Sequence, residues 1–116
     1  MTLSEYETRL ADALRARDPV AAVHAFAPGA DADGVRLTAL LVARLRFERL
    51  LRGSRAADAW FAADPAGFAR AFSAYHEAVA PRAFFPRDEA WLFFAWRRAA
   101  IPCARLRRRW PATRRI

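Results

Sequence analysis

The side chains that most often bind metals or act as nucleophiles are few in this sequence and stand far apart. It contains two histidines, His24 and His76, and one cysteine, Cys103. No two of them have the spacing of three to five residues that would place both on one metal ion. The four glycines are scattered, so no phosphate-binding loop is present. The sequence therefore predicts no catalytic residue, no metal ligand and no cofactor in this chain.

Two of these side chains, Cys103 and His76, have both a structural and a catalytic interpretation. Cys103 has arginine neighbours, which favour a reactive thiolate, but nucleophilic catalysis also needs a nearby base, so we interpret Cys103 as a bystander. His76 follows Tyr75 and precedes Glu77, one step off an apolar helical stripe. A boundary histidine that hydrogen-bonds locally is the favoured interpretation of His76, and a catalytic acid–base is the alternative.

Charge is distributed unevenly along the chain. Residues 1–96 carry 12 arginines and 12 acids, whereas residues 97–116 carry eight arginines and no acid, so the net charge of +8 lies in the last twenty residues. Trp96 and Trp110 lie among these cations, and nucleic-acid binders combine cations with aromatics in this way. A solvated basic terminus is the alternative. The basic-tail candidates are Arg105, Arg107, Arg108, Arg109, Arg114 and Arg115.

The abundance of arginine is by itself weak evidence for phosphate or nucleic-acid binding. The chain contains 29 alanines and 20 arginines but no lysine, asparagine or glutamine. Alanine and arginine have GC-rich codons, so a GC-rich genome explains the preference without any need for phosphate recognition by a guanidinium fork.

Length and composition predict a single globular domain that is soluble and cytoplasmic. The chain has 116 residues, of which 55% are hydrophobic, enough for one core. One cysteine makes no internal disulfide, and the start lacks the pattern of a signal peptide. The longest apolar run, residues 90–96, is far shorter than the ~20 residues of a membrane span.

Helix signals dominate the pattern. Capping boxes at Thr2 or Ser4 begin a helix that ends near Arg17, and an Asp-Pro pair begins a short second one. A loop over 27–34 leads to the longest predicted helix, 35–52, closed by Gly53. Its first half is apolar nearly all round, which predicts burial on several sides, and its arginine-rich second half is expected to be half exposed.

Three further helices complete the prediction. They cover 54–63, a stripe from Phe68 to Val79 after a second Asp-Pro pair, and 89–100 with Asp88 as its cap. We therefore predict an all-α fold, a compact bundle of about six helices, with residues 1–103 as one helical domain and 104–116 as a basic tail.

Phe84 and Phe85 stand in the predicted loop before the last helix. Two adjacent phenylalanines in a loop can both fold under the core, and this is the favoured interpretation. The alternative is an exposed anchor for a partner.

A series of aromatic and proline landmarks covers about half the chain, from Val42 to Arg98. It comprises Arg44, Arg49, Trp60-Phe61, Asp64-Pro65, Phe68, Phe72, Tyr75-His76, Pro81, Phe85-Pro86, Glu89-Ala90, Phe93 or Phe94, and Trp96. This series resembles the small partner proteins of multinuclear non-heme iron-dependent oxidases that modify ribosomally made peptides. It is most similar to the partner in 3-thiaglutamate biosynthesis, whose oxidase works on a cysteine at the end of a carrier peptide.

The resemblance implies a non-catalytic subunit that docks on the oxidase as a heterodimer and helps to bind the precursor peptide. Iron would then lie on the oxidase and not on this chain. The alternative is a small helical module whose function is to bind nucleic acid through the arginine tail. If the chain is instead the partner of an oxidase, any nucleic-acid binding is expected to be non-specific. The candidate partner- or peptide-binding residues are Trp60, Tyr75, His76, Phe84, Phe85, Asp88, Glu89, Trp91, Trp96, Arg97 and Arg98.

Overall fold

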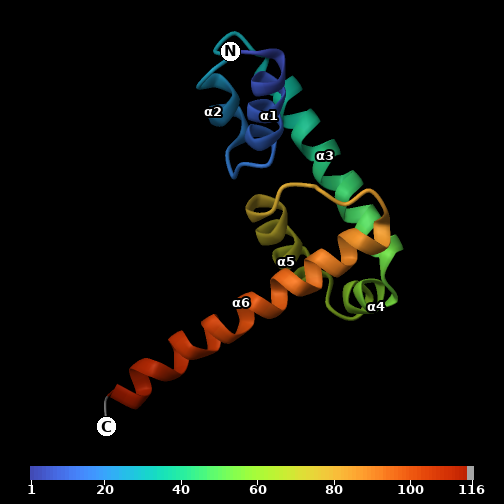
Figure 1. The fold of residues 1–116 in the computed structure, drawn as a ribbon, viewed down its shortest axis with the longest axis vertical. Coiled ribbons are helices and arrows are strands. Elements are labelled where there is room, and N and C mark those ends of the chain that lie inside the picture. Colours follow the sequence, from blue (N-terminus) through green and yellow to red (C-terminus); the bar gives the residue numbers. More distant parts are fainter. Residues whose placement is uncertain (115–116) are drawn as a thin grey trace.

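Residues 1–114, whose backbone the structure describes, fold into six α-helices, and the predicted all-α class is confirmed (Figure 1). A computed structural model describes the backbone of residues 1–114 and the side chains of residues 1–100. No strand occurs in that part of the chain. The helices are α1 (Leu3–Leu14), α2 (Pro19–His24), α3 (Ala32–Gly53), α4 (Arg55–Ala63), α5 (Pro65–Ala78) and α6 (Pro86–Arg114).

Five of these helices begin after a residue whose side-chain oxygen caps the first turn. Thr2 and Glu5 form the capping box of α1, whereas the Ser4 alternative is not used. Before α2, α3, α4 and α5, the cap accepts the N–H three residues on, which satisfies a donor that the helix itself leaves free. These caps are Asp18, Asp31, Ser54 and Asp64. The Asp31 cap starts α3 inside the segment predicted as loop.

Two apolar clusters hold the helices together. The larger one joins α3, α4, α5 and α6 around Leu50, Phe68, Tyr75 and Phe93, each fully buried. The smaller one joins α1, α2 and the start of α3 around Ala13, Val23 and Val35. Helix α3 belongs to both clusters and runs between them (Figure 1).

The predicted burial along α3 was wrong for its first half, where Leu37, Leu40 and Leu41 are exposed. Its second half is half exposed as predicted, because the buried Arg46 and Leu50 alternate with exposed residues. The α1–α2 pair is small and covers only one side of the first half. The second half contacts α4 and α6 at once, so even an arginine becomes buried there.

Gly53 and Asp88 also differ from prediction. Gly53 has no positive φ, so it is not a left-handed cap. Instead, a Cβ at this position would collide with the backbone of Pro86, so glycine allows the end of α3 to approach the start of α6. Because α6 begins at Pro86, Asp88 lies in its first turn and is not its cap.

Helix α6 is longer than predicted. The sequence favoured an end at Ala100, before Pro102, but the helix continues to Arg114, across the suggested boundary between domain and tail. Alanine, arginine and leucine on both sides of Pro102 favour helix, and the proline removes a single N–H. The C-terminal part of α6 extends away from the other helices (Figure 1). Over the described residues, no helix has both the length and the apolar character needed to cross a membrane.

Candidate functional site

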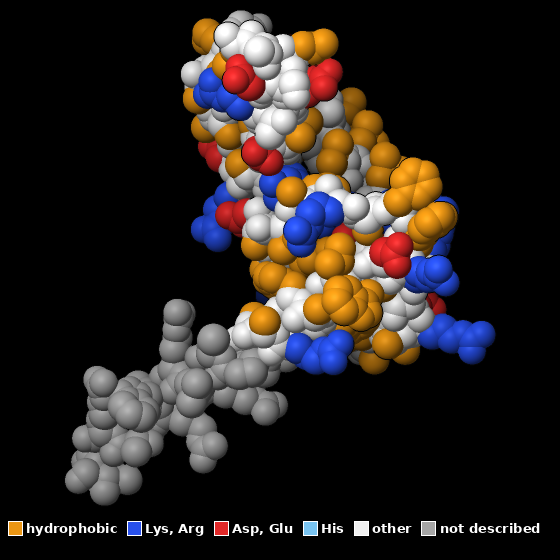
Figure 2. Space-filling view, in the orientation of Figure 1, with side chains coloured by type: hydrophobic (Ala, Val, Ile, Leu, Met, Phe, Trp, Pro, Cys, Tyr) orange, Lys and Arg blue, Asp and Glu red, His pale blue; other side chains and the backbone are white. Residues whose placement is uncertain are grey.

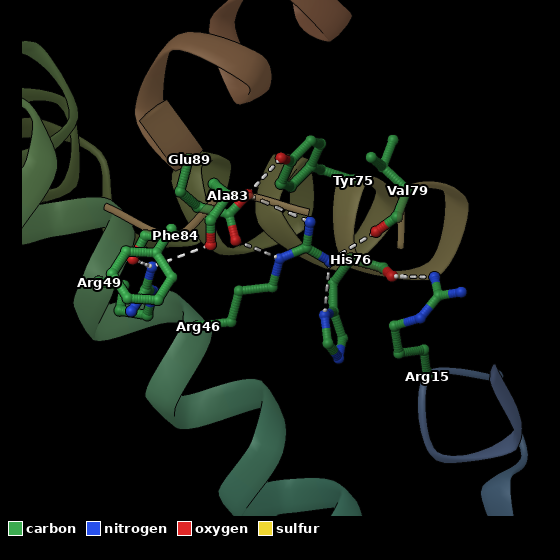
Figure 3. Close-up of polar contacts among 9 residues, drawn as sticks. All are labelled: Arg15, Arg46, Arg49, Tyr75, His76, Val79, Ala83, Phe84 and Glu89. Carbon is green, nitrogen blue, oxygen red and sulfur yellow. Dashed lines mark hydrogen bonds and ion pairs between the residues drawn. The ribbon is translucent and has the colours of Figure 1, made fainter. Parts of the chain in front are cut away.

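A buried ion pair between α3 and α6 is the centre of the most polar region of the interior (Figure 3). Arg46 is 4% exposed and Glu89 is 2% exposed. Nε of Arg46 donates to Oε1 of Glu89 at 2.7 Å, and Nη2 donates to Oε2 at 3.3 Å. This forked geometry holds two charges that would be costly to bury singly.

Tyr75 of α5 completes the pair. Its hydroxyl donates to Oε2 of Glu89 at 2.6 Å, and the guanidinium of Arg46 lies 4.5 Å from the centre of its ring. Burial and the Glu89 carboxylate raise the pKa of Tyr75 to about 12. For Glu89, burial acts to raise the pKa, but the hydrogen bonds from Arg46 and Tyr75 outweigh it, so the pKa is lowered. Tyr75 therefore stays protonated and Glu89 stays ionised at neutral pH.

His76 is the neutral member of the network. Burial, followed by the positive charges of Arg46 and Arg15, lowers the pKa of His76 to about 4. Nη1 of Arg46 lies 3.2 Å from Nδ1 of the ring. A guanidinium can only donate, so Nδ1 accepts and the proton of the neutral ring is on Nε2. Phe72 stacks on the ring at 5.5 Å between centroids.

Arginines also bind the chain that links α5 to α6. Arg46 donates to the carbonyl of Val79 at 2.6 Å, and Arg49 donates to those of Ala83 and Phe84 at 3.1 and 2.7 Å (Figure 3). This connector, residues 79–85, has no helix or sheet to satisfy its backbone. The arginines of α3 therefore fix its path.

The network is suited to holding structure. Both oxygens of Glu89 accept hydrogen bonds, and Arg46, Tyr75, His76 and Glu89 are buried. Arg46, Tyr75 and Glu89 thus spend their polar atoms on one another and on the backbone of the connector. What the network does is position the surface above it.

That surface is apolar. Phe84 is 82% exposed and Phe85 is 53% exposed, so the prediction that they close the core was wrong. Their rings contact each other edge to face at 5.1 Å between centroids. Arg49 holds their segment beside α3, on which Leu37, Leu40, Leu41 and Leu45 are 49–65% exposed. Figure 2 shows hydrophobic side chains along α3 and over the connector. We define the α3–connector face as Leu37, Leu40, Leu41, Leu45, Phe84 and Phe85.

The other predicted binding residues fall into two groups. Arg97 lies 4.1 Å from the centre of the Trp60 ring, and Trp96 packs on Tyr75 at 5.5 Å, so these three belong to the α4–α6 side of the core. Asp88, Trp91 and Arg98 are exposed on α6. The side chains of the predicted tail cations lie outside the described residues; these are Arg105, Arg107, Arg108, Arg109, Arg114 and Arg115.

Sequence reasoning missed Arg46 and Arg15 as site residues. The helical spacing of Ala43, Arg46 and Leu50 was the available signal for Arg46, since three- and four-residue steps place all three on one face. Arg15 donates to the carbonyls of His76 and Glu77 at 3.0 and 3.2 Å, a contact between segments about sixty residues apart that periodicity cannot reveal.

No group of three metal-ligating side chains occurs among the described residues. Comparison with protein-family models, with curated proteins and with solved structures gave no match.

Proposed function

We propose that this protein is a non-catalytic partner subunit that docks on a larger protein through the α3–connector face. The observation that carries the proposal is the exposure of six large apolar side chains on one helix and its adjoining connector. Contiguous apolar patches of more than a few hundred Å² on a soluble chain mark interaction sites. The buried ion pair beneath supports this role, because it fixes the connector and so reduces the entropy lost on binding.

The resemblance gives the partner a chemical identity. A multinuclear non-heme iron-dependent oxidase would receive this face, and the two chains together would bind a precursor peptide whose cysteine is modified. On this proposal iron is bound by the oxidase, and residues such as Trp91 and Arg98 on α6 are available to the peptide.

Co-expression with a candidate oxidase tests the docking step. A complex should survive gel filtration at high salt, because the proposed contacts are apolar. Leu41→Ser should release the oxidase, whereas Leu3→Ser, which alters an exposed leucine on α1, should leave the complex intact. Separate elution of the two wild-type chains at every salt concentration would contradict docking.

Nucleic-acid binding is the second candidate, favoured by the eight arginines of residues 97–116. Phosphate contacts alone give affinity that falls by about 10³-fold between 50 and 200 mM salt for some six phosphates. If this binding is incidental, deleting residues 105–116 abolishes it and leaves the oxidase complex. A preferred sequence bound ~10³-fold more tightly than random nucleic acid at physiological salt would favour the nucleic-acid function instead.

A further inference from the structure

A pocket of about 590 Å³ is lined by His76 but not by Arg46 or Glu89. It is formed by the α1–α2 turn, the middle of α3 and the length of α5. Its volume is within the range of small-molecule sites in proteins. Ala43, Ala69 and Phe72 form apolar parts of the wall, and Ser73 adds a hydroxyl.

Two buried polar atoms beside this pocket have no hydrogen-bond partner. They are Nε of Arg15 and Nε2 of His76, and both residues line the pocket. His76 is 7% exposed. Figure 3 shows its second ring nitrogen on the side away from Arg46. Native chains satisfy nearly all buried polar groups, so two unsatisfied ones on residues that line one pocket require an explanation.

Both atoms are hydrogen-bond donors. Nε of a guanidinium always carries hydrogen, and Nε2 of His76 carries the ring proton because Nδ1 accepts from Arg46. The group that satisfies them must therefore present acceptors. A cation, or a donor such as an ammonium group, does not fit.

The charges around the pocket also favour a group that presents acceptors, and specifically an anionic one. Arg15, Arg17 and Arg70 line it, against one acid, Glu77. Arg15 is paired with Asp12 at 2.8 Å, which leaves Arg17 and Arg70 to outweigh Glu77. Arg17, Arg70 and Glu77 are exposed, so their side chains can turn as a ligand enters. Such movement is needed, because the two donors are covered in this structure.

We propose that this pocket binds an oxyanion group, a carboxylate or a phosphate, which accepts from Nε2 of His76 and Nε of Arg15 and is held by the guanidinium of Arg70. The site is separate from the α3–connector face, so it does not depend on the proposed docking function. A small anionic metabolite can therefore bind in this pocket while the partner is bound at the α3–connector face.

Nuclear magnetic resonance of the two histidine rings gives a direct test on the full-length chain labelled with ¹⁵N. Inorganic phosphate and acetate are the probes, with sodium chloride at equal ionic strength as the blank. The Nε2 signal of His76 should shift saturably with phosphate or acetate and not with chloride. His24, whose Nε2 lies 2.9 Å from the carbonyl of Ala30, serves as the internal control and should not shift. Tighter binding of phosphate or of acetate identifies which oxyanion the pocket prefers.

Two matched variants locate the binding. Arg70→Ala removes an exposed pocket arginine and should weaken binding by about 5-fold, as expected for a charge contact open to solvent. Arg55→Ala removes the same charge from the exposed surface of α4 and should change affinity by less than ~2-fold. Equal effects of the two variants would overturn the proposal. So would a His76 signal that responds to neither probe, which is the result if water alone satisfies the donors.

Discussion

Breaking the Arg46–Glu89 pair should cost far more stability than breaking any exposed pair in the described part of the chain. Glu89→Gln keeps the shape and the acceptor for Tyr75 but leaves the cation of Arg46 buried without its counterion. Arg46→Met removes the cation and also leaves Val79 O and His76 Nδ1 without a donor. Uncompensated burial of one partner costs about 3–5 kcal/mol. A small domain has only ~5–15 kcal/mol in total, so each single variant should lose a large part of its free energy of unfolding.

The double variant shows whether the cost comes from the pairing. With both charges gone, neither is left uncompensated, so the double variant should be more stable than the sum of the single costs predicts, by about 1–3 kcal/mol. Urea unfolding at pH 7 measures all four chains in one cycle. The exposed pair Arg44–Glu48, 3.2 Å apart on α3, is the control, and Arg44→Met with Glu48→Gln should cost under ~1 kcal/mol. Additive single costs, or costs equal to those of the control, would refute the reasoning.

Three further predictions concern pH, packing and partner contact. The pKa of His76 is lowered from 6.5 to about 4 in the folded chain, so on acidification the imidazole of the unfolded chain is protonated first. The free energy of unfolding should therefore fall by about 3 kcal/mol as the pH drops from 6.5 to 4. Unfolding of His76→Gln should lose that part of the slope, and an unchanged slope would assign it elsewhere. Gly53→Ala should lower stability by about 1–3 kcal/mol in the same assay, because the added Cβ would meet the backbone of Pro86. Gly29→Ala is the control and should be neutral, since open space surrounds that position. Equal effects of the two variants would contradict the close approach of α3 and α6. Phe84→Ser should change unfolding by under ~0.5 kcal/mol yet weaken oxidase co-purification, and a large loss of stability would mean that Phe84 is needed for the core.

Local signals in the sequence were sufficient for the helices and their starts. The Asp-Pro pairs at residues 18 and 64 and the stripe of α5 depend only on neighbouring residues, and the structure confirms them. Tertiary contacts decided the rest. The first half of α3 was expected to be buried but is exposed, because burial depends on which helices pack beside it, which periodicity does not specify.

The site was only partly predictable for the same reason. Tyr75, His76 and Glu89 were predicted as partner- or peptide-binding residues, but they are buried around a shared partner, Arg46, which is separated from Glu89 by 43 residues. Phe84 and Phe85 were expected in the core on hydrophobicity alone. Arg49 overrides that preference by binding the backbone of their segment, which leaves both rings outside.

The arginines of α3 hold the connector by its carbonyl oxygens, which every residue type possesses. Side chains from residue 80 to 84 can therefore mutate with little effect on the path of the chain, and recognition of a partner can drift faster in evolution than the fold does. Arg46 has no such freedom, since its three nitrogens serve Glu89, His76 and Val79 together, and a lysine has only one nitrogen to offer. Related chains adapted to different partners should therefore vary in the connector and keep arginine at the position of Arg46.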